Sequence, residues 1–495
     1  MQKKQTILVV ASLLLVVLSV TLAYFTAQII GKGKDVSVSS ADLKIIFTDS
    51  DGSISGTNIE PGWSDTKTFT IENRSNETYK YNIVIQDLIN TFVTEGYLQY
   101  KITSTNNGYN MTEFKDVPKS ETATDTILAY SVSISVGVTQ SYTVEFKYAN
   151  DESVDQSNDM GKKLSGTLFI TEGTEDPNKT LYNQLLVDKS TKLTRTDFSK
   201  VLTDNNTNTL YTGVEDSKTV YYFAGNATDN WVKFGKNASN QDLYWRIIRT
   251  NSDGSVRLLY HGTSTTTTDA YIGTSAFNSS YDNIAYVSYM YGSLGSISSA
   301  RENTNNSTIK TTIDNWYISN LEAKGYTKYL STTAVYCNDR SISSDSINFG
   351  AFTRLGTNKT PSYDCAATED KFTVDTSTGN GKLTYPIALM TADEVSFAGG
   401  LYGANTPTWY YYNSVNGSST GSKFWWLLSP LDSSTSGSSM FIVRGSSNPG
   451  RLNYNYVYSN NGVRPALSLK SCVKYSSGDG SANEPYTIKE TETGC

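Results

Sequence analysis

The four cysteines are the residues of this sequence with the fewest possible chemical roles, disulfides or a thiol metal site. Cys337, Cys365, Cys472 and Cys495 all lie in the C-terminal third of the 495-residue chain. An even number of cysteines favours disulfides where a chain is exported. Three pairings are possible, and we expect the sequential one, Cys337 with Cys365 and Cys472 with Cys495. A thiol metal site would need a C-x-x-C spacing that the sequence lacks, so we expect no bound metal.

The single histidine, His261, follows the apolar run Leu258-Leu259-Tyr260. It has no thiol partner for a catalytic dyad if the cysteines form disulfides, and we expect a structural role for it. The sequence contains no G-x-S-x-G, no H-E-x-x-H and no P-loop. Two carboxylates for glycoside hydrolysis need no local motif, but nothing in the sequence singles out a pair. The prediction is therefore a protein that is not an enzyme and needs no cofactor.

Aromatic clusters near the C-terminus indicate binding instead. Trp409 begins the run Trp-Tyr-Tyr-Tyr, and Trp426 lies within Phe-Trp-Trp-Leu-Leu. Exposed aromatic faces stack on sugar rings and anchor interfaces. We therefore predict a ligand-binding surface formed by Trp409, Trp426, Asp393, Arg444 and Arg464. The alternatives are that alternate residues of the tryptophan run face a core, and that Arg464 and Asp393 make structural hydrogen bonds under a sheet.

The N-terminus predicts export. Residues 5–31 contain no charged side chain and follow Lys3 and Lys4. The run from Thr6 to Ile30 exceeds the roughly 20 apolar residues that cross a bilayer, and the basic tip would stay inside. Residues 1–31 are thus a signal peptide or a signal anchor. The protein is expected to be secreted or to lie on the extracellular face of the membrane, tethered through residues 6–30 if the signal is kept.

Composition agrees with an exported β-rich chain. The 41 basic and 48 acidic residues give a net charge of −7, which argues against nucleic acid as a partner. Tyrosine (35 copies) outnumbers phenylalanine (17), as expected where strands and polar loops dominate.

Strand patterns divide the chain into two regions. Alternating or apolar runs between residues 36 and 171 predict an antiparallel sandwich. The polar stretch 172–210, with a short helical pattern at 181–187, predicts a linker. Residues 211–495 combine a hairpin (244–249 with 256–260) with helices at 309–321 and from Thr391 to about Gly399. The expected fold class is mainly β, with an α+β C-terminal part.

The first region contains three short ordered pieces, Ser39-Ser40-Ala41-Asp42-Leu43-Lys44-Ile45, Glu60-Pro61-Gly62-Trp63 and Phe69-Thr70-Ile71-Glu72-Asn73. With these pieces it resembles the TasA/camelysin family of exported Gram-positive fibre proteins. Thr21-Leu22-Ala23 before Tyr24-Phe25 resembles that family's signal-peptidase junction, which favours cleavage there. The resemblance implies a jelly-roll-like β-sandwich that can self-assemble by donating strands. Some members are described as metalloproteases, but this region has no histidine and that activity is not carried over.

The second region resembles an uncharacterised domain of secreted Gram-positive proteins. The matching pieces include Trp231-Val232-Lys233-Phe234, Tyr336-Cys337-Asn338-Asp339-Arg340, Trp426-Leu427-Leu428-Ser429-Pro430 and Gly462-Val463-Arg464-Pro465-Ala466-Leu467. The last two resemble the C-type-lectin-like fold that formylglycine-generating enzymes share. The resemblance therefore implies a C-type-lectin-like α+β domain over 211–495, with a disulfide-closed tail. The cysteines match no redox-active pair of that enzyme, so its activity is not implied.

Taken together, these patterns predict an exported cell-surface protein with a non-enzymatic role in adhesion or in binding a glycan or protein ligand. A biofilm-type structural fibre subunit, assembling through the N-terminal sandwich, is one alternative. A formylglycine-generating-type enzyme is another and would require a free thiol. A scaffold without a ligand is the third.

Overall fold

The computed structural model describes residues 36–37, 43–47, 52–55 and 59–495, except 112, 178, 205, 268–269, 343–347, 411–423, 435–436 and 446–447. The predicted signal segment, residues 1–31, lies outside the described residues. Strands hold 39% of the chain and helices 14%, which confirms the mainly β fold class. The chain forms two compact units, Met1–Pro177 and Asn178–Cys495.

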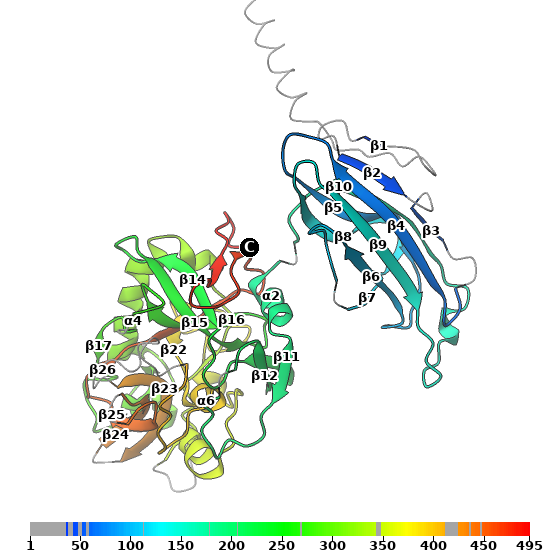
Figure 1. Ribbon diagram of the computed structural model, residues 1–495. Helices are drawn as coiled ribbons and strands as arrows, with labels where there is room; N and C mark the ends of the chain where they lie inside the picture. The colour runs from blue at the N-terminus through cyan, green and yellow to red at the C-terminus, as the bar shows by residue number, and fades with distance from the viewer. Residues whose placement is uncertain are drawn as a thin grey trace, which may run out of the picture. The chain divides into compact units, whose positions relative to one another are not determined.

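The first unit is a β-sandwich (Figure 1). One sheet has the order β1 (Val36–Ser37), β2 (Leu43–Phe47), β4 (Ser64–Asn73), β9 (Thr139–Tyr148), β6 (Leu98–Ser104) and β7 (Lys115–Asp116). The other has the order β3 (Ser53–Ser55), β10 (Leu164–Glu172), β5 (Tyr79–Asn90) and β8 (Ser120–Ile134). From β2 to β10 the chain passes repeatedly between the sheets. Alternate side chains such as Ile71, Ile83 and Val144 are fully buried between them.

The second unit is built on a ten-stranded sheet. Its main path is β11 (Thr191–Thr194), β12 (Thr209–Glu215), β13 (Lys218–Tyr222), β15 (Asp242–Thr250), β14 (Trp231–Lys236), β29 (Tyr486–Ile488) and β28 (Tyr475–Ser477). From β15 the sheet branches through β16 (Val256–Gly262) and β27 (Pro465–Leu469) to β22 (Ile387–Leu389). The branch strands are almost entirely buried, because both faces pack against other parts of the unit.

A five-stranded sheet lies in the same unit and ends at an edge strand. Its order is β17 (Thr274–Ser275), β26 (Asn461–Gly462), β23 (Trp425–Ser434), β24 (Gly437–Val443) and β25 (Leu452–Tyr456). Two-stranded ladders pair β18 (Met290–Tyr291) with β19 (Asn305–Asn306), and β20 (Tyr336–Cys337) with β21 (Lys371–Phe372). The α-helices of this unit are α2 (Leu181–Asp188), α3 (Ile297–Ala300), α4 (Thr308–Tyr317), α5 (Gly350–Phe352) and α6 (Ala392–Phe397).

Local signals placed several of these elements correctly. The predicted hairpin is the antiparallel pair β15–β16. Helix α4 follows Ser307, whose side chain accepts a hydrogen bond from the backbone N–H of Lys310, as an N-cap residue should. The helical stretch continues through Ile318–Glu322 and stops before Gly325, which has a φ of 77°. The helix expected from Thr391 is α6.

The predicted linker 172–210 needs correction. The second unit begins at Asn178, so most of this stretch belongs to it. Leu181 and Leu185 of α2, together with Leu210 of β12, are buried in the core of that unit. Strand β11 pairs with β12 in parallel. Because most residues of the stretch are polar, its few buried apolar side chains were not predicted to join a core.

Both predicted disulfides are confirmed, Cys337–Cys365 and Cys472–Cys495. All four cysteines are therefore oxidised, and this points to an oxidising compartment outside the cytosol. The Cys472–Cys495 bridge spans 23 residues and closes the tail that carries β28 and β29.

We expect the Cys472→Ser/Cys495→Ser double variant to lose about 3 kcal/mol of unfolding free energy in the second unit, the loop-closure value for a bridge of this span. Urea unfolding followed by tryptophan fluorescence measures it, because six of the seven tryptophans lie in this unit. A loss below about 1 kcal/mol would contradict the assigned role of the bridge.

Candidate functional site

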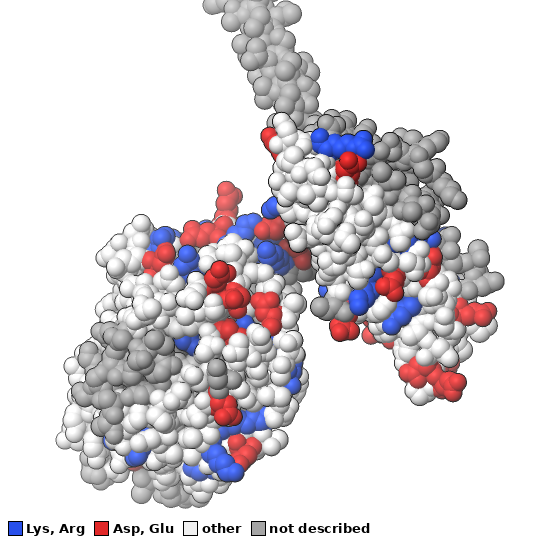
Figure 2. Space-filling model, in the orientation of Figure 1, with Lys and Arg blue, Asp and Glu red and all other residues white. Residues whose placement is uncertain are grey.

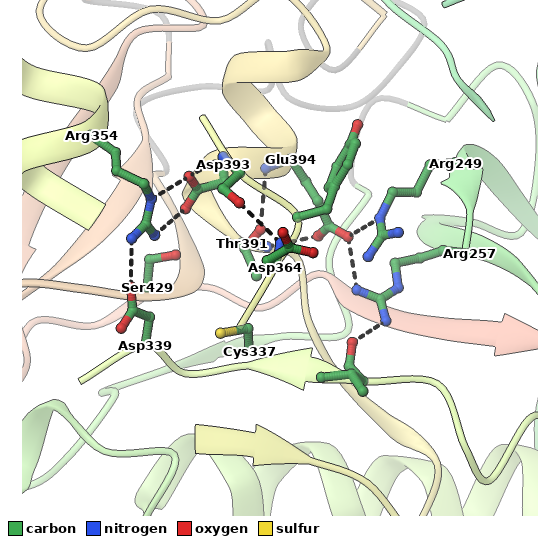
Figure 3. A pocket seen from close by; sticks show the side chains of 13 residues that line it. Arg249, Arg257, Cys337, Asp339, Arg354, Asp364, Thr391, Asp393, Glu394 and Ser429 are labelled. Atoms are coloured by element: carbon green, nitrogen blue, oxygen red, sulfur yellow. Dashed lines mark hydrogen bonds and ion pairs between the residues drawn. The ribbon is translucent and has the colours of Figure 1, made fainter. Parts of the chain in front are cut away.

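Two buried arginines of the β15–β16 hairpin meet one carboxylate of α6 (Figure 3). Arg249 Nε and Arg257 Nη1 donate to the same oxygen, Glu394 Oε1, at 2.9 and 2.8 Å. Arg249 Nη2 also donates to Glu215 Oε1 of β12 at 2.7 Å. None of the four side chains is more than 6% exposed. We call these four residues the buried ion network.

The start of α6 fixes the position of Glu394. The Thr391 side chain accepts a hydrogen bond from the Glu394 backbone N–H, and Glu394 Oε2 accepts one from the Thr391 backbone N–H at 2.9 Å. This reciprocal capping box satisfies the first turn of the helix. Glu394 therefore uses one carboxylate oxygen for its own helix and the other for the two arginines.

Arg354 makes a second set of ion pairs in the same pocket. Its Nε and Nη2 bind Asp393 Oδ1 and Oδ2, each at 3.0 Å, and its Nη1 binds Asp339 Oδ2 at 2.7 Å. The backbone N–H of Ser362 also donates to Asp393 at 3.0 Å. Cys337, two residues before Asp339, lines the pocket and carries the disulfide to Cys365.

The electrostatics of this pocket oppose acid–base catalysis. Burial raises the pKa of Glu394, but Arg257 and Arg249 lower it by more, to about 2. Burial also raises the pKa of Glu215 and of Asp339. The neighbouring arginines, Arg249 at Glu215 and Arg354 at Asp339, lower these pKa values, and both end below their ordinary values. These carboxylates stay ionised at neutral pH and hold no proton to donate. The cavity between them measures about 20 Å³, room for one water molecule.

Only Asp393 among the five predicted binding residues lines this pocket. Its carboxylate is held by Arg354, so it serves the structural role that the sequence left open. Arg464 is buried too, and its Nε and Nη2 donate to the carbonyl oxygen of Tyr260 at 3.2 and 3.1 Å. Arg444 is half-buried over the ring of Phe424, at 5.0 Å from the centroid.

The predicted tryptophan surface is wrong for this fold. Trp409 and Trp426 are 0% exposed and belong to the core of the second unit. Trp409 Nε1 donates to the carbonyl oxygen of Ala398, and Trp426 Nε1 to that of Ser275, each at 2.8 Å. Since each indole N–H is satisfied inside the protein, burial of the whole ring is favourable. His261 is likewise buried, with its ring edge-on to Trp231 at 4.4 Å.

Among the described residues, the large aromatic side chains that are clearly exposed are tyrosines near the edge of the five-stranded sheet. Tyr281, Tyr456 and Tyr458 are 44%, 45% and 49% exposed, and the ring of Tyr458 contacts those of the other two. We call these three residues the tyrosine patch. Tyr454, 39% exposed, lies two residues before Tyr456 and so on the same face of β25. The sequence analysis missed them, although tyrosines at 454, 456 and 458 follow the period of a strand.

No protein-family model, curated protein or solved structure matches this chain. Within the described residues, no helix is long and apolar enough to span a membrane. That part of the chain also contains no group of three or more His, Cys, Asp or Glu side chains arranged to hold a metal ion. The geometry is therefore the basis for assigning a function.

We expect the Glu394→Gln variant to lose about 3–5 kcal/mol of unfolding free energy in the second unit, because two buried arginines lose the charge that they share. The stabilisation by Glu394 is present above its ordinary pKa of 4.5 and is lost as the pH falls towards 2. Wild-type stability should therefore fall more steeply between pH 5 and 2 than that of the variant. Urea unfolding followed by tryptophan fluorescence at several pH values measures both effects.

Glu484→Gln is the matched control, because Glu484 is exposed and the substitution should change stability by less than about 0.5 kcal/mol. Equal losses in the two variants, or parallel pH profiles for wild type and Glu394→Gln, would contradict the role assigned to the buried ion network.

Proposed function

We propose that this protein is exported and binds a ligand outside the cell through the tyrosine patch, without carrying out chemistry on it. The observation that carries the proposal is the exposure of three tyrosine rings, in which Tyr458 contacts both Tyr281 and Tyr456, in a unit whose tryptophans are buried or packed against the core. Tyrosine presents a large, rigid apolar face and a polar hydroxyl, and it is enriched where proteins bind partners.

Several further observations support an extracellular binder. Two disulfides suit an oxidising environment, and the apolar N-terminal run of the sequence suits export. The resemblance to the C-type-lectin-like fold is part of this proposal and implies no particular ligand. The formylglycine-generating alternative has less support, because a thiol mechanism needs a free cysteine and all four are in disulfides.

We expect Tyr458→Ala to weaken ligand binding by the full chain at least tenfold, because it removes the most exposed ring of the patch. The measurement is binding to two arrays, one of glycans and peptidoglycan fragments and one of extracellular proteins. Tyr130→Ala is the control, since Tyr130 is a half-exposed tyrosine of β8 in the first unit. Silence of the wild-type chain on both arrays, or equal binding by Tyr458→Ala, would overturn the proposal.

A fibre subunit is the second candidate, and one feature of the first unit favours it. Strand β8 is an edge of its sheet, and Glu121–Asp125 are exposed along it. Among the described residues only β5 pairs with β8, so its outer edge can accept a strand from another copy.

If the protein forms fibres, electron microscopy of the full chain should show filaments that increase with protein concentration. Ala123→Lys, which places a charge on the exposed half of β8, should suppress them. A chain that stays monomeric in sedimentation at all concentrations would rule out this candidate.

A further inference from the structure

The rings of the tyrosine patch offer faces in two orientations. Tyr456 and Tyr458 are nearly parallel, with an interplanar angle of 10° and centroids 5.7 Å apart. Tyr281 is inclined by 54° to Tyr458, with centroids 4.8 Å apart. Tyr458 is therefore stacked on Tyr456 and tilted against Tyr281.

Backbone hydrogen bonds hold the segments that carry these rings. The carbonyl oxygen of Val457, between Tyr456 and Tyr458, accepts hydrogen bonds from the N–H groups of Phe277 and Asn278, at 2.8 and 3.1 Å. The Val457 N–H donates to the carbonyl oxygen of Ser438 at 3.1 Å. Since this backbone is fixed before a ligand arrives, little conformational entropy is lost on binding.

Gly437 makes room for two of the rings. A Cβ atom at this position of β24 would lie 2.9 Å from Cε1 of Tyr456 and 4.0 Å from Cδ2 of Tyr281. Both rings therefore pack over bare backbone. A side chain at 437 would have to displace the Tyr456 ring, although this glycine has no unusual φ.

Uncharged polar groups lie beside the patch, together with one exposed carboxylate, Asp282, which follows Tyr281 in the chain. Asn455 Oδ1 accepts hydrogen bonds from the Tyr456 N–H at 3.0 Å and from Ser459 Oγ at 3.1 Å. Asn455 Nδ2 donates to Asn461 Oδ1 at 3.2 Å. Figure 2 shows few charged side chains on the visible face around β24 and β25. Amides and hydroxyls suit a ligand rich in hydroxyl groups and give no reason to expect a highly charged one.

The size of the patch favours a small recognition unit. A tyrosine side chain offers roughly 150–250 Å² of surface, so three that are nearly half exposed present on the order of 300 Å². A stable protein–protein interface buries about 800 Å² on each partner. The patch alone is too small for such an interface, whereas one or two sugar rings would fill it.

We infer that the tyrosine patch binds an uncharged polysaccharide, with the C–H face of a pyranose ring stacked on the aromatic rings. The neighbouring amides and phenol hydroxyls supply hydrogen bonds to the sugar hydroxyls. This inference rests on the proposed function and names the ligand class of the same site.

The test is depletion of the full chain from solution by insoluble chitin and by cellulose, with alginate as an anionic comparison and immobilised fibronectin and mucin polypeptide as protein comparisons. We expect depletion by at least one of the uncharged polysaccharides. Tyr458→Ala should weaken it at least tenfold, while Tyr458→Phe should keep it within about threefold, because the ring provides the contact. Gly437→Ala, which disturbs the Tyr456 ring, should weaken binding while Tyr130→Ala does not.

Each outcome decides between the two proposals. Tyrosine-dependent binding confined to the protein probes, or to alginate, overturns the carbohydrate inference and leaves the proposed function standing. Binding to chitin or cellulose that Tyr458→Ala leaves unchanged places the carbohydrate site elsewhere and overturns the inference. Absence of binding to every probe here and on the arrays overturns both. Far-ultraviolet circular dichroism and Tm of each variant confirm that it is folded.

Discussion

Glu394 Oε1 accepts hydrogen bonds from two arginine side chains, and the second unit is organised around that contact. Burying isolated charges costs several kcal/mol per ion, so they are tolerated only when each finds partners. Here Glu215, the β15–β16 hairpin and α6 contribute groups far apart in sequence. None of these elements can move away without leaving a charge unpaired. The network therefore holds α6 in place on the ten-stranded sheet.

The need to pair each buried charge also limits where this unit can bind a ligand. In the pocket of Figure 3 the carboxylates of Asp339, Asp393 and Glu394 each pair with an arginine, and the cavity between them has room for only one water molecule. A pocket of this kind fixes geometry but cannot admit a ligand without breaking ion pairs. The proposed recognition therefore uses the outer surface, where Tyr456 lies on the edge strand β25, Tyr458 follows that strand, and Tyr281 lies in the loop before Ile284–Val287. The side chains of the tyrosine patch can be substituted without disturbing the buried ion network.

Local chemistry explains what the sequence predicted well. The helices α4 and α6, the hairpin and the sequential disulfides each depend on residues close together in the chain. Whether a side chain is buried depends on residues distant in the chain, and the predicted exposure of the tryptophans was wrong. Trp409 and Trp426 sit among polar loops in sequence, yet carbonyl groups of Ala398 and Ser275 satisfy their indoles inside the core. The β12 partner at Glu215 could not be foreseen, because it has no local signature, whereas a structural role for Asp393 was one of the two roles that the sequence allowed.

The difference between the tryptophans and the tyrosines follows from their positions in the sheet. Trp425 and Trp426 of β23 project from opposite faces of the sheet, and both are buried because other parts of the unit cover both faces there. Leu452, Tyr454 and Tyr456 lie on one face of β25. Leu452 is buried where it also forms a bridge to Tyr402, and exposure rises to 39% and 45% at Tyr454 and Tyr456. The exposed tyrosine rings at this end of the strand contribute little to the core, which is why the proposal assigns them to binding.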